Sequence, residues 1–186
     1  MSTVIHWTTK DLETLPDDGT RYEIVEGELL MTRAPNFEHQ HVCGKLYSQL
    51  LTWSERTKAG EPYLTPGLIF ADDDNVIPDL IWMSKARLVD ALDDAGHFIV
   101  APELVIEVLS YGADDERRDR VIKLALYSKY GVQDYWIVDW RNRKIEIYRR
   151  ANEGLNFHSV LNQTDTLTSP LLPEFQCRVG AIFEHI

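Results

Sequence analysis

The chain has 186 residues, which is enough to bury one sizeable core without disulfides or a structural metal. Its hydrophobic fraction of 44% and charged fraction of 26% are ordinary for a folded globular protein and exclude a disordered or fibrous class. The net charge of -11 argues against general binding of nucleic acid, because Lys and Arg supply much of the affinity for phosphates.

The two cysteines, Cys43 and Cys177, form no CxxC pair, and no secretory leader is recognisable ahead of them. This usage favours a reducing, cytoplasmic setting. The longest apolar runs are too short to cross a bilayer, so no membrane partner is expected. With no repeat, linker or low-complexity stretch, we expect a single domain over residues 1–186.

The predicted elements begin with a β-hairpin, whose strands 21–25 and 29–31 are joined through Glu26, Gly27 and Glu28. An amphipathic helix follows over residues 38–58, because apolar side chains recur there at intervals of three and four. We expect Gly60 and Pro62 to end it.

The remainder of the chain predicts further strands, two helical stretches and an acidic turn. Strands are expected at 68–70, 77–83, 98–109, 135–138, 144–148 and 157–161, an acidic turn at 72–75, a short helical stretch at 85–92, and a helix at 114–130 closed by Gly131. This order indicates a mixed α/β fold around one sheet, with an N-terminal hairpin and C-terminal strands.

Glu107 lies within the apolar run from Leu104 to Leu109. Alternation along a strand places it on one face with Val105 and Leu109, so its carboxylate is expected to be buried. A buried charge requires a cation, which here is either a metal or an Arg or Lys side chain across the sheet.

Asp79 follows Pro78 and precedes the apolar residues of the next predicted strand. Proline lacks a donor for the strand ladder and therefore suits the first residue of a strand. Two carboxylates on neighbouring strands favour Mg²⁺ or Mn²⁺, which prefer oxygen ligands.

Lys123 belongs to a helical stripe with Asp119 and Tyr127. It is either half of an exposed ion pair with Asp119 or a cation directed over the sheet at the two carboxylates. The residues alone leave both possibilities open.

An ordered set of motifs resembles the Uma2 family, formerly DUF820, of the PD-(D/E)xK restriction endonuclease-like superfamily. The motifs are Pro78-Asp79, the segment from Glu103 to Ser110, Asp119 and Lys123 in a helix, the segment from Tyr127 to Asp139, the segment from Arg21 to Leu29, and His39-Gln40. The resemblance covers roughly residues 12–149. It implies a central four-stranded mixed sheet flanked by helices, with the active site on adjoining strands.

The resemblance also implies roles for individual residues. The parent motif would place a Lys two residues after Glu107, where this chain has Leu109, so Lys123 is the matching residue. Asp79, Glu107 and Lys123 are then the catalytic set. Glu23, Glu26, His39 and Asp119 are possible accessory residues. Glu26 could instead be a turn residue, and His39 could cap its helix or face solvent, while Asp119 is expected to orient Lys123.

The mechanism that follows is metal-assisted hydrolysis of a phosphodiester, and DNA is the nucleic acid expected as the substrate. Asp79, Glu107 and the backbone carbonyl of Val108 would hold Mg²⁺ or Mn²⁺, and Lys123 would assist the attacking water or stabilise the charged transition state. The alternative is a non-catalytic module on a nuclease scaffold that binds nucleic acid or protein. A hydrolase of small phosphate esters fits the acidic charge but lacks a Gly-rich phosphate loop.

Residues 117–150 carry 10 of the 19 Lys and Arg and only 4 of the 30 Asp and Glu. The stretch is either a solvated face or a local basic surface that steers nucleic acid towards the cleft. The candidate contacts are Arg117, Arg118, Arg120, Arg141, Arg143 and Lys144. A homodimer is also possible, because duplex cleavage needs two sites and exposed aromatics near Tyr135 and Trp136 could pair.

Overall fold

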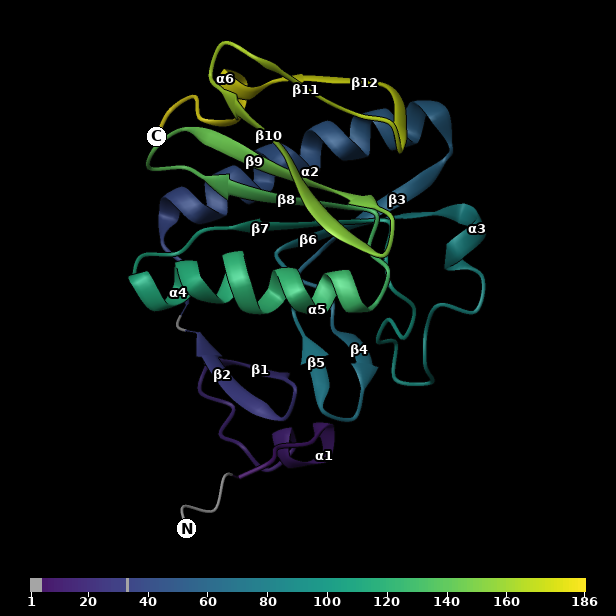
Figure 1. The fold of residues 1–186 in the computed structure, drawn as a ribbon, viewed down its shortest axis with the longest axis vertical. Helices are drawn as coiled ribbons and strands as arrows, with labels where there is room; N and C mark the ends of the chain where they lie inside the picture. Colours follow the sequence, from purple (N-terminus) through teal and green to yellow (C-terminus); the bar gives the residue numbers. More distant parts are fainter. Residues whose placement is uncertain (1–4, 33) are drawn as a thin grey trace.

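The computed structural model describes residues 5–32 and 34–186, and its centre is a six-stranded mixed sheet in the order β10-β9-β8-β7-β6-β3 (Figure 1). β7 and β8 run parallel, and all other neighbours are antiparallel. The strands are β3 (Gly60–Leu64), β6 (Leu80–Ser84), β7 (Leu104–Val108), β8 (Asp134–Asp139), β9 (Lys144–Ala151) and β10 (Gly154–Asn162). The predicted mixed α/β class is confirmed.

The expectation of four strands in this sheet is wrong, because β3 and β10 extend it at the two edges. Gly60 and Pro62, expected only to end a helix, belong to β3. Proline cannot donate to a strand ladder, and an edge strand tolerates it.

Two smaller antiparallel sheets accompany the large one. The first has the order β2-β1-β5-β4 and the second pairs β11 with β12. Their strands are β1 (Arg21–Val25), β2 (Glu28–Thr32), β4 (Leu68–Ala71), β5 (Asp74–Val76), β11 (Thr166–Ser169) and β12 (Leu172–Arg178). The predicted hairpin is confirmed as β1–β2, whose two-residue turn has positive φ at both Glu26 (50°) and Gly27 (75°).

The helices differ greatly in length. They are α1 (Thr9–Leu12), α2 (Phe37–Thr57), α3 (Lys85–Leu88), α4 (Ala113–Arg117), the π-helical segment η1 (Arg118–Lys123), α5 (Leu124–Lys129) and α6 (Val179–Ile182). Asn36 caps the start of α2, because its side chain accepts a hydrogen bond from the His39 amide, and Lys58 in the left-handed conformation caps its end. Among the described helices, none combines the length and apolar character that crossing a bilayer requires.

The large sheet is covered on both faces, and Figure 1 shows α2 on one side and the helix α4–η1–α5 on the other. The first core unites Leu104, Ile106 and Val108 of β7 with α2, β12 and α6. The second core unites Val105 and Leu109 with α5 and with the sheet β2-β1-β5-β4. Alternation therefore directs Glu107 towards the helix α4–η1–α5.

The helix predicted over residues 114–130 is continuous through α4, η1 and α5. Its middle turn is π-helical, a local widening that often occurs at functional sites. The helix then ends at Gly131, whose φ of 88° is left-handed, as predicted.

Two glycine substitutions test this helix end. Gly131→Ala should lower the free energy of unfolding by about 1–2 kcal/mol, because a left-handed φ costs an L-residue that amount. Gly44→Ala, in α2 with open space around its Cβ, should raise that energy by roughly 0.5–1 kcal/mol. Urea unfolding measures both, and equal effects of the two changes would contradict the prediction.

Candidate active site

Asp79 and Glu107 lie side by side because of the register of β6 and β7. Leu80 pairs with Ile106, so Asp79, immediately before β6, lies opposite Glu107. The Asp79 amide donates to Glu107 Oε2 at 3.3 Å. The two residues are only 3% and 2% exposed, so both carboxylates are removed from water as expected for Glu107.

Lys123 reaches this pair from η1 on the facing helix. Its Nζ lies 2.9 Å from Glu107 Oε1 and 2.8 Å from Glu23 Oε1. Lys123 is 2% exposed, which rules out the exposed ion pair with Asp119. Tyr127 adds a second donor from the same helix, with its hydroxyl 2.7 Å from Glu107 Oε1. Without a metal, Lys123 supplies the cation that a buried Glu107 needs.

Asp79 accepts hydrogen bonds from three directions. Oδ2 accepts from the Val108 amide at 2.9 Å and from His39 Nε2 at 3.1 Å, and Oδ1 accepts from Arg21 at 3.2 Å. Burial raises the pKa of Asp79, but the hydrogen bond from His39 and the charge of Arg21 outweigh it and hold the pKa below its usual range. Asp79 is therefore fixed as an anion.

The pKa values of Glu107 and Lys123 show how strongly the ion pair depends on its members. Burial raises the pKa of Glu107 above its usual range, against the opposing charge of Lys123. Burial lowers the pKa of Lys123, but the carboxylates of Glu107 and Glu23 more than reverse this effect and raise it. Each charge is tolerated here because the other is present.

These groups surround a cavity of about 10 Å³, which is room for about one water or ion. The lining residues are Arg21, Glu23, Thr32, Pro35, His39, Asp79, Glu107, Val108, Ser110, Arg118, Asp119 and Lys123. Four of them are carboxylates and three are Lys or Arg. Carboxylate oxygens suit a hard divalent cation such as Mg²⁺.

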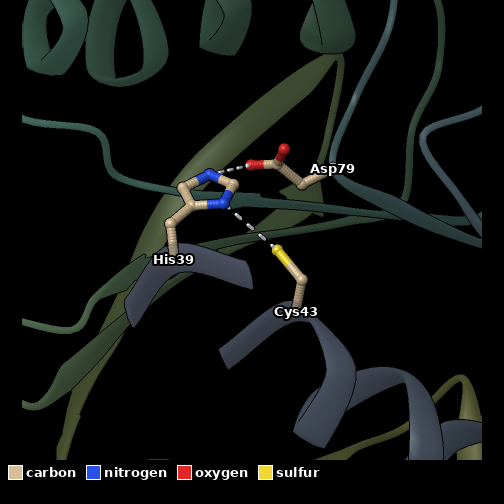
Figure 2. Close-up of side chains that lie close together, drawn as sticks. All are labelled: His39, Cys43 and Asp79. Atoms are coloured by element: carbon tan, nitrogen blue, oxygen red, sulfur yellow. Dashed lines mark hydrogen bonds and ion pairs between the residues drawn. The ribbon is translucent and has the colours of Figure 1, made fainter. Parts of the chain in front are cut away.

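Figure 2 shows that His39 joins Cys43 of the same helix to Asp79. Cys43 Sγ is 3.6 Å from His39 Nδ1, and all three side chains are buried. Their ligand atoms lie within 4.8 Å of one another, yet the two ring nitrogens face different partners. Asp79 and Cys43 bond opposite nitrogens of the His39 ring, so a single ion bound to one nitrogen would not reach all three residues. The geometry therefore suits a chain of hydrogen bonds that orients Asp79, and not a metal centre.

The accessory residues separate into two groups. Glu23 and His39 line the cavity, and His39 faces Asp79 from the first turn of α2. Asp119 lines it too, but accepts from Arg118 Nε at 3.2 Å, and no direct bond to Lys123 is present. Glu26 is exposed in the β1–β2 turn and lies outside the cavity lining, so its expected alternative as a turn residue holds.

Three further residues of the site carried no separate assignment in the sequence. Arg21 and Tyr127 stood within the motifs that resemble Uma2, which is the signal that could have identified them. Cys43 had only its spacing of four residues from His39 on a helix.

The predicted basic stretch is largely neutralised within the fold. Arg118 pairs with Asp115 and Asp119, and Arg120 pairs with Glu116 and Glu146. The remaining partners are Glu116 and Asp139 for Arg141, Glu146 for Lys144 and the Ile186 carbonyl for Arg143; Arg117 is exposed. Contact with nucleic acid by these residues stays a prediction.

The suggestion that exposed aromatics near Tyr135 and Trp136 could pair two copies is wrong. Both side chains are fully buried in the two cores of the sheet. Tyr135 also donates its hydroxyl hydrogen to the Asp119 carbonyl at 2.9 Å, so it braces the helix that carries Lys123.

The mixed sheet, its flanking helices and the paired carboxylates define an α/β protein of nuclease-like fold. A solved structure from Anabaena variabilis ATCC 29413, described as a "putative nuclease belonging to DUF820", is similar, with a TM-score of 0.77 and 18% identity over 95% of this chain and 97% of that one. The model of the Uma2 family, described as "Putative restriction endonuclease", matches residues 9–180. The chain therefore belongs to the Uma2 family, as the sequence motifs indicated.

Proposed function

We propose that the protein, acting as one domain, is a divalent-metal-dependent nuclease that hydrolyses phosphodiester bonds, with DNA as the first substrate to test. The observation that carries this proposal is the pair of buried carboxylates, Asp79 and Glu107, at one small cavity with Lys123. Membership of the Uma2 family supports it.

Asp79, Glu107 and the carbonyl of Val108 would hold the ion, which is Mg²⁺ or Mn²⁺ by the chemistry of these donors. When bound, the ion would polarise the scissile phosphate and acidify water. His39 from α2 and the Val108 amide from β7 both bond Asp79 Oδ2, so this carboxylate is oriented before an ion binds.

Lys123 would stabilise charge that develops on the phosphate during hydrolysis. Its Nζ is held by Glu23 and Glu107, so the ammonium has a fixed position. Arg21 lines the same cavity and bonds Asp79. Its side chain is 22% exposed, compared with 2% for that of Lys123, so Arg21 would meet an entering phosphate first.

The rival function is a binding module on a nuclease scaffold. The net charge of -11 and the internal ion pairs of Arg118, Arg120 and Arg141 favour it, because few free cations remain for a phosphate backbone. Nuclease activity is the better supported of the two because an interaction module has no need for two carboxylates buried side by side.

The deciding experiment combines the purified protein with DNA, RNA and nucleotides, each with Mg²⁺, Mn²⁺ or EDTA. We expect cleavage of a polynucleotide that requires the metal and is lost in a Glu107→Gln variant purified in the same way. Absence of cleavage of every substrate, or equal cleavage by the variant, would favour the binding module.

A further inference from the structure

We propose that a groove beside the catalytic cavity receives an unpaired nucleobase next to the scissile phosphate, so the preferred substrate is single-stranded or locally unpaired nucleic acid. This inference rests on the proposed nuclease function and deepens it. The groove has a volume of about 420 Å³. It is lined by Met31, Thr32, Ala34, Pro35, Asn36, Ser110, Tyr111 and Asp115.

The groove is continuous with the catalytic cavity. Thr32, Pro35 and Ser110 line both, so a strand whose phosphate lies at Asp79 and Glu107 reaches the groove with its neighbouring nucleotide. Its volume lies within the range of small-molecule sites and accommodates a nucleobase.

Tyr111 gives this groove an aromatic wall. It lies in the loop between β7 and α4, directly before Gly112, and its side chain is 62% exposed. Trp140 packs against it edge to face, with ring centroids 5.1 Å apart, and the Arg141 guanidinium lies 5.6 Å from its ring centroid. An exposed ring that is already braced loses little conformational freedom when a base stacks on it.

The other side chains that line the groove suit a base better than a phosphate. Among the described lining residues, Asp115 alone is charged, and its Oδ1 is paired with Arg118 at 3.0 Å. Thr32, Asn36 and Ser110 offer neutral donors and acceptors for base edges. In a duplex the faces of the bases are covered by their neighbours, so a base reaches Tyr111 only when it is unstacked.

The test measures binding of a strand containing 2-aminopurine, single-stranded and as a duplex, with Ca²⁺ in place of Mg²⁺ to hold the strand. We expect tighter binding of the single strand and quenching of its fluorescence by stacking. Tyr111→Ala should weaken single-strand binding by about tenfold and abolish the quenching, whereas Tyr111→Phe keeps the ring and should retain both.

Phe37→Ala is the matched control, because Phe37 is 66% exposed near the groove but does not line it. It should leave single-strand binding unchanged. Duplex binding as tight as single-strand binding, or an unchanged affinity of Tyr111→Ala, would overturn the groove proposal. If metal-dependent cleavage persists in that case, the proposed nuclease function still stands; no binding or cleavage of any nucleic acid would overturn both.

Discussion

Glu107→Gln and Asp79→Asn should each reduce metal-dependent cleavage at least about 10³-fold, because a metal ligand contributes several kcal/mol to the transition state. Both changes keep the size of the side chain and remove one negative charge from the cavity. The measurement is the single-turnover cleavage rate over a range of Mg²⁺ concentrations. A variant that keeps the wild-type rate at every Mg²⁺ concentration would contradict a role for that carboxylate in holding the ion.

These conservative changes are preferable to alanine for a structural reason. Glu107 accepts hydrogen bonds from Lys123, Tyr127 and the Asp79 amide, so alanine would leave buried donors without partners. Glutamine keeps one acceptor oxygen, which at the Oε1 position still serves Lys123 and Tyr127, and loses only the acceptor for the 3.3 Å contact from the Asp79 amide. The matched control is Glu103→Gln on the same chain segment, whose carboxylate bonds Ser84 and lies outside the cavity lining, and it should retain the wild-type rate.

Lys123→Met should lower the free energy of unfolding by about 3–5 kcal/mol, the usual cost of leaving a buried charge without its partner. The change removes the ammonium that lies between Glu23 and Glu107, while methionine preserves most of the volume. Urea or thermal unfolding at neutral pH measures the effect.

Two further variants separate the charge effect from lost packing. Adding Glu107→Gln to Lys123→Met should restore part of the stability, because one unpaired carboxylate is then removed. Lys129→Met should cost less than Lys123→Met, because the Lys129 side chain is 51% exposed and its buried partner Asp74 keeps hydrogen bonds from the Tyr130 hydroxyl and the Glu26 amide. Equal losses for Lys123→Met and Lys129→Met would contradict the importance of the buried pair.

Mg²⁺ provides an independent check on the same variant. A divalent ion at Glu107 would replace part of the missing positive charge, so Mg²⁺ should raise the melting temperature of Lys123→Met more than that of the wild-type protein. No difference between the two proteins would contradict the replacement of the Lys123 charge by the ion.

The pair of carboxylates could be predicted from sequence because both signals are local. A carboxylate inside an apolar strand and a Pro-Asp at the start of another need only the alternation of strand side chains. The side chains that bond these carboxylates were harder to predict from the sequence. Arg21 and His39 reach Asp79 across 58 and 40 residues of chain, and only the register and helix packing bring them there.

The sheet was predicted less completely for a similar reason. β3 contains Gly60 and Pro62, which are typical of breaks, and it is a strand because it pairs with β6 along five residue pairs. The basic stretch shows the same limit. Clustering in sequence suggested a free surface, whereas the fold places Glu116, Asp139 and Glu146 beside those cations.

The placement of Lys123 on a helix, and of Asp79 and Glu107 on strands, divides the site between two layers of the molecule. Under the proposed mechanism the strands carry the ligands of the ion, whereas the position of the ammonium depends on how the helix packs on the sheet. Substitutions in the buried face of that helix, at Leu126 for example, would therefore change the turnover rate more than the metal affinity. A lysine two residues from the glutamate on one strand would tie the two properties together more closely.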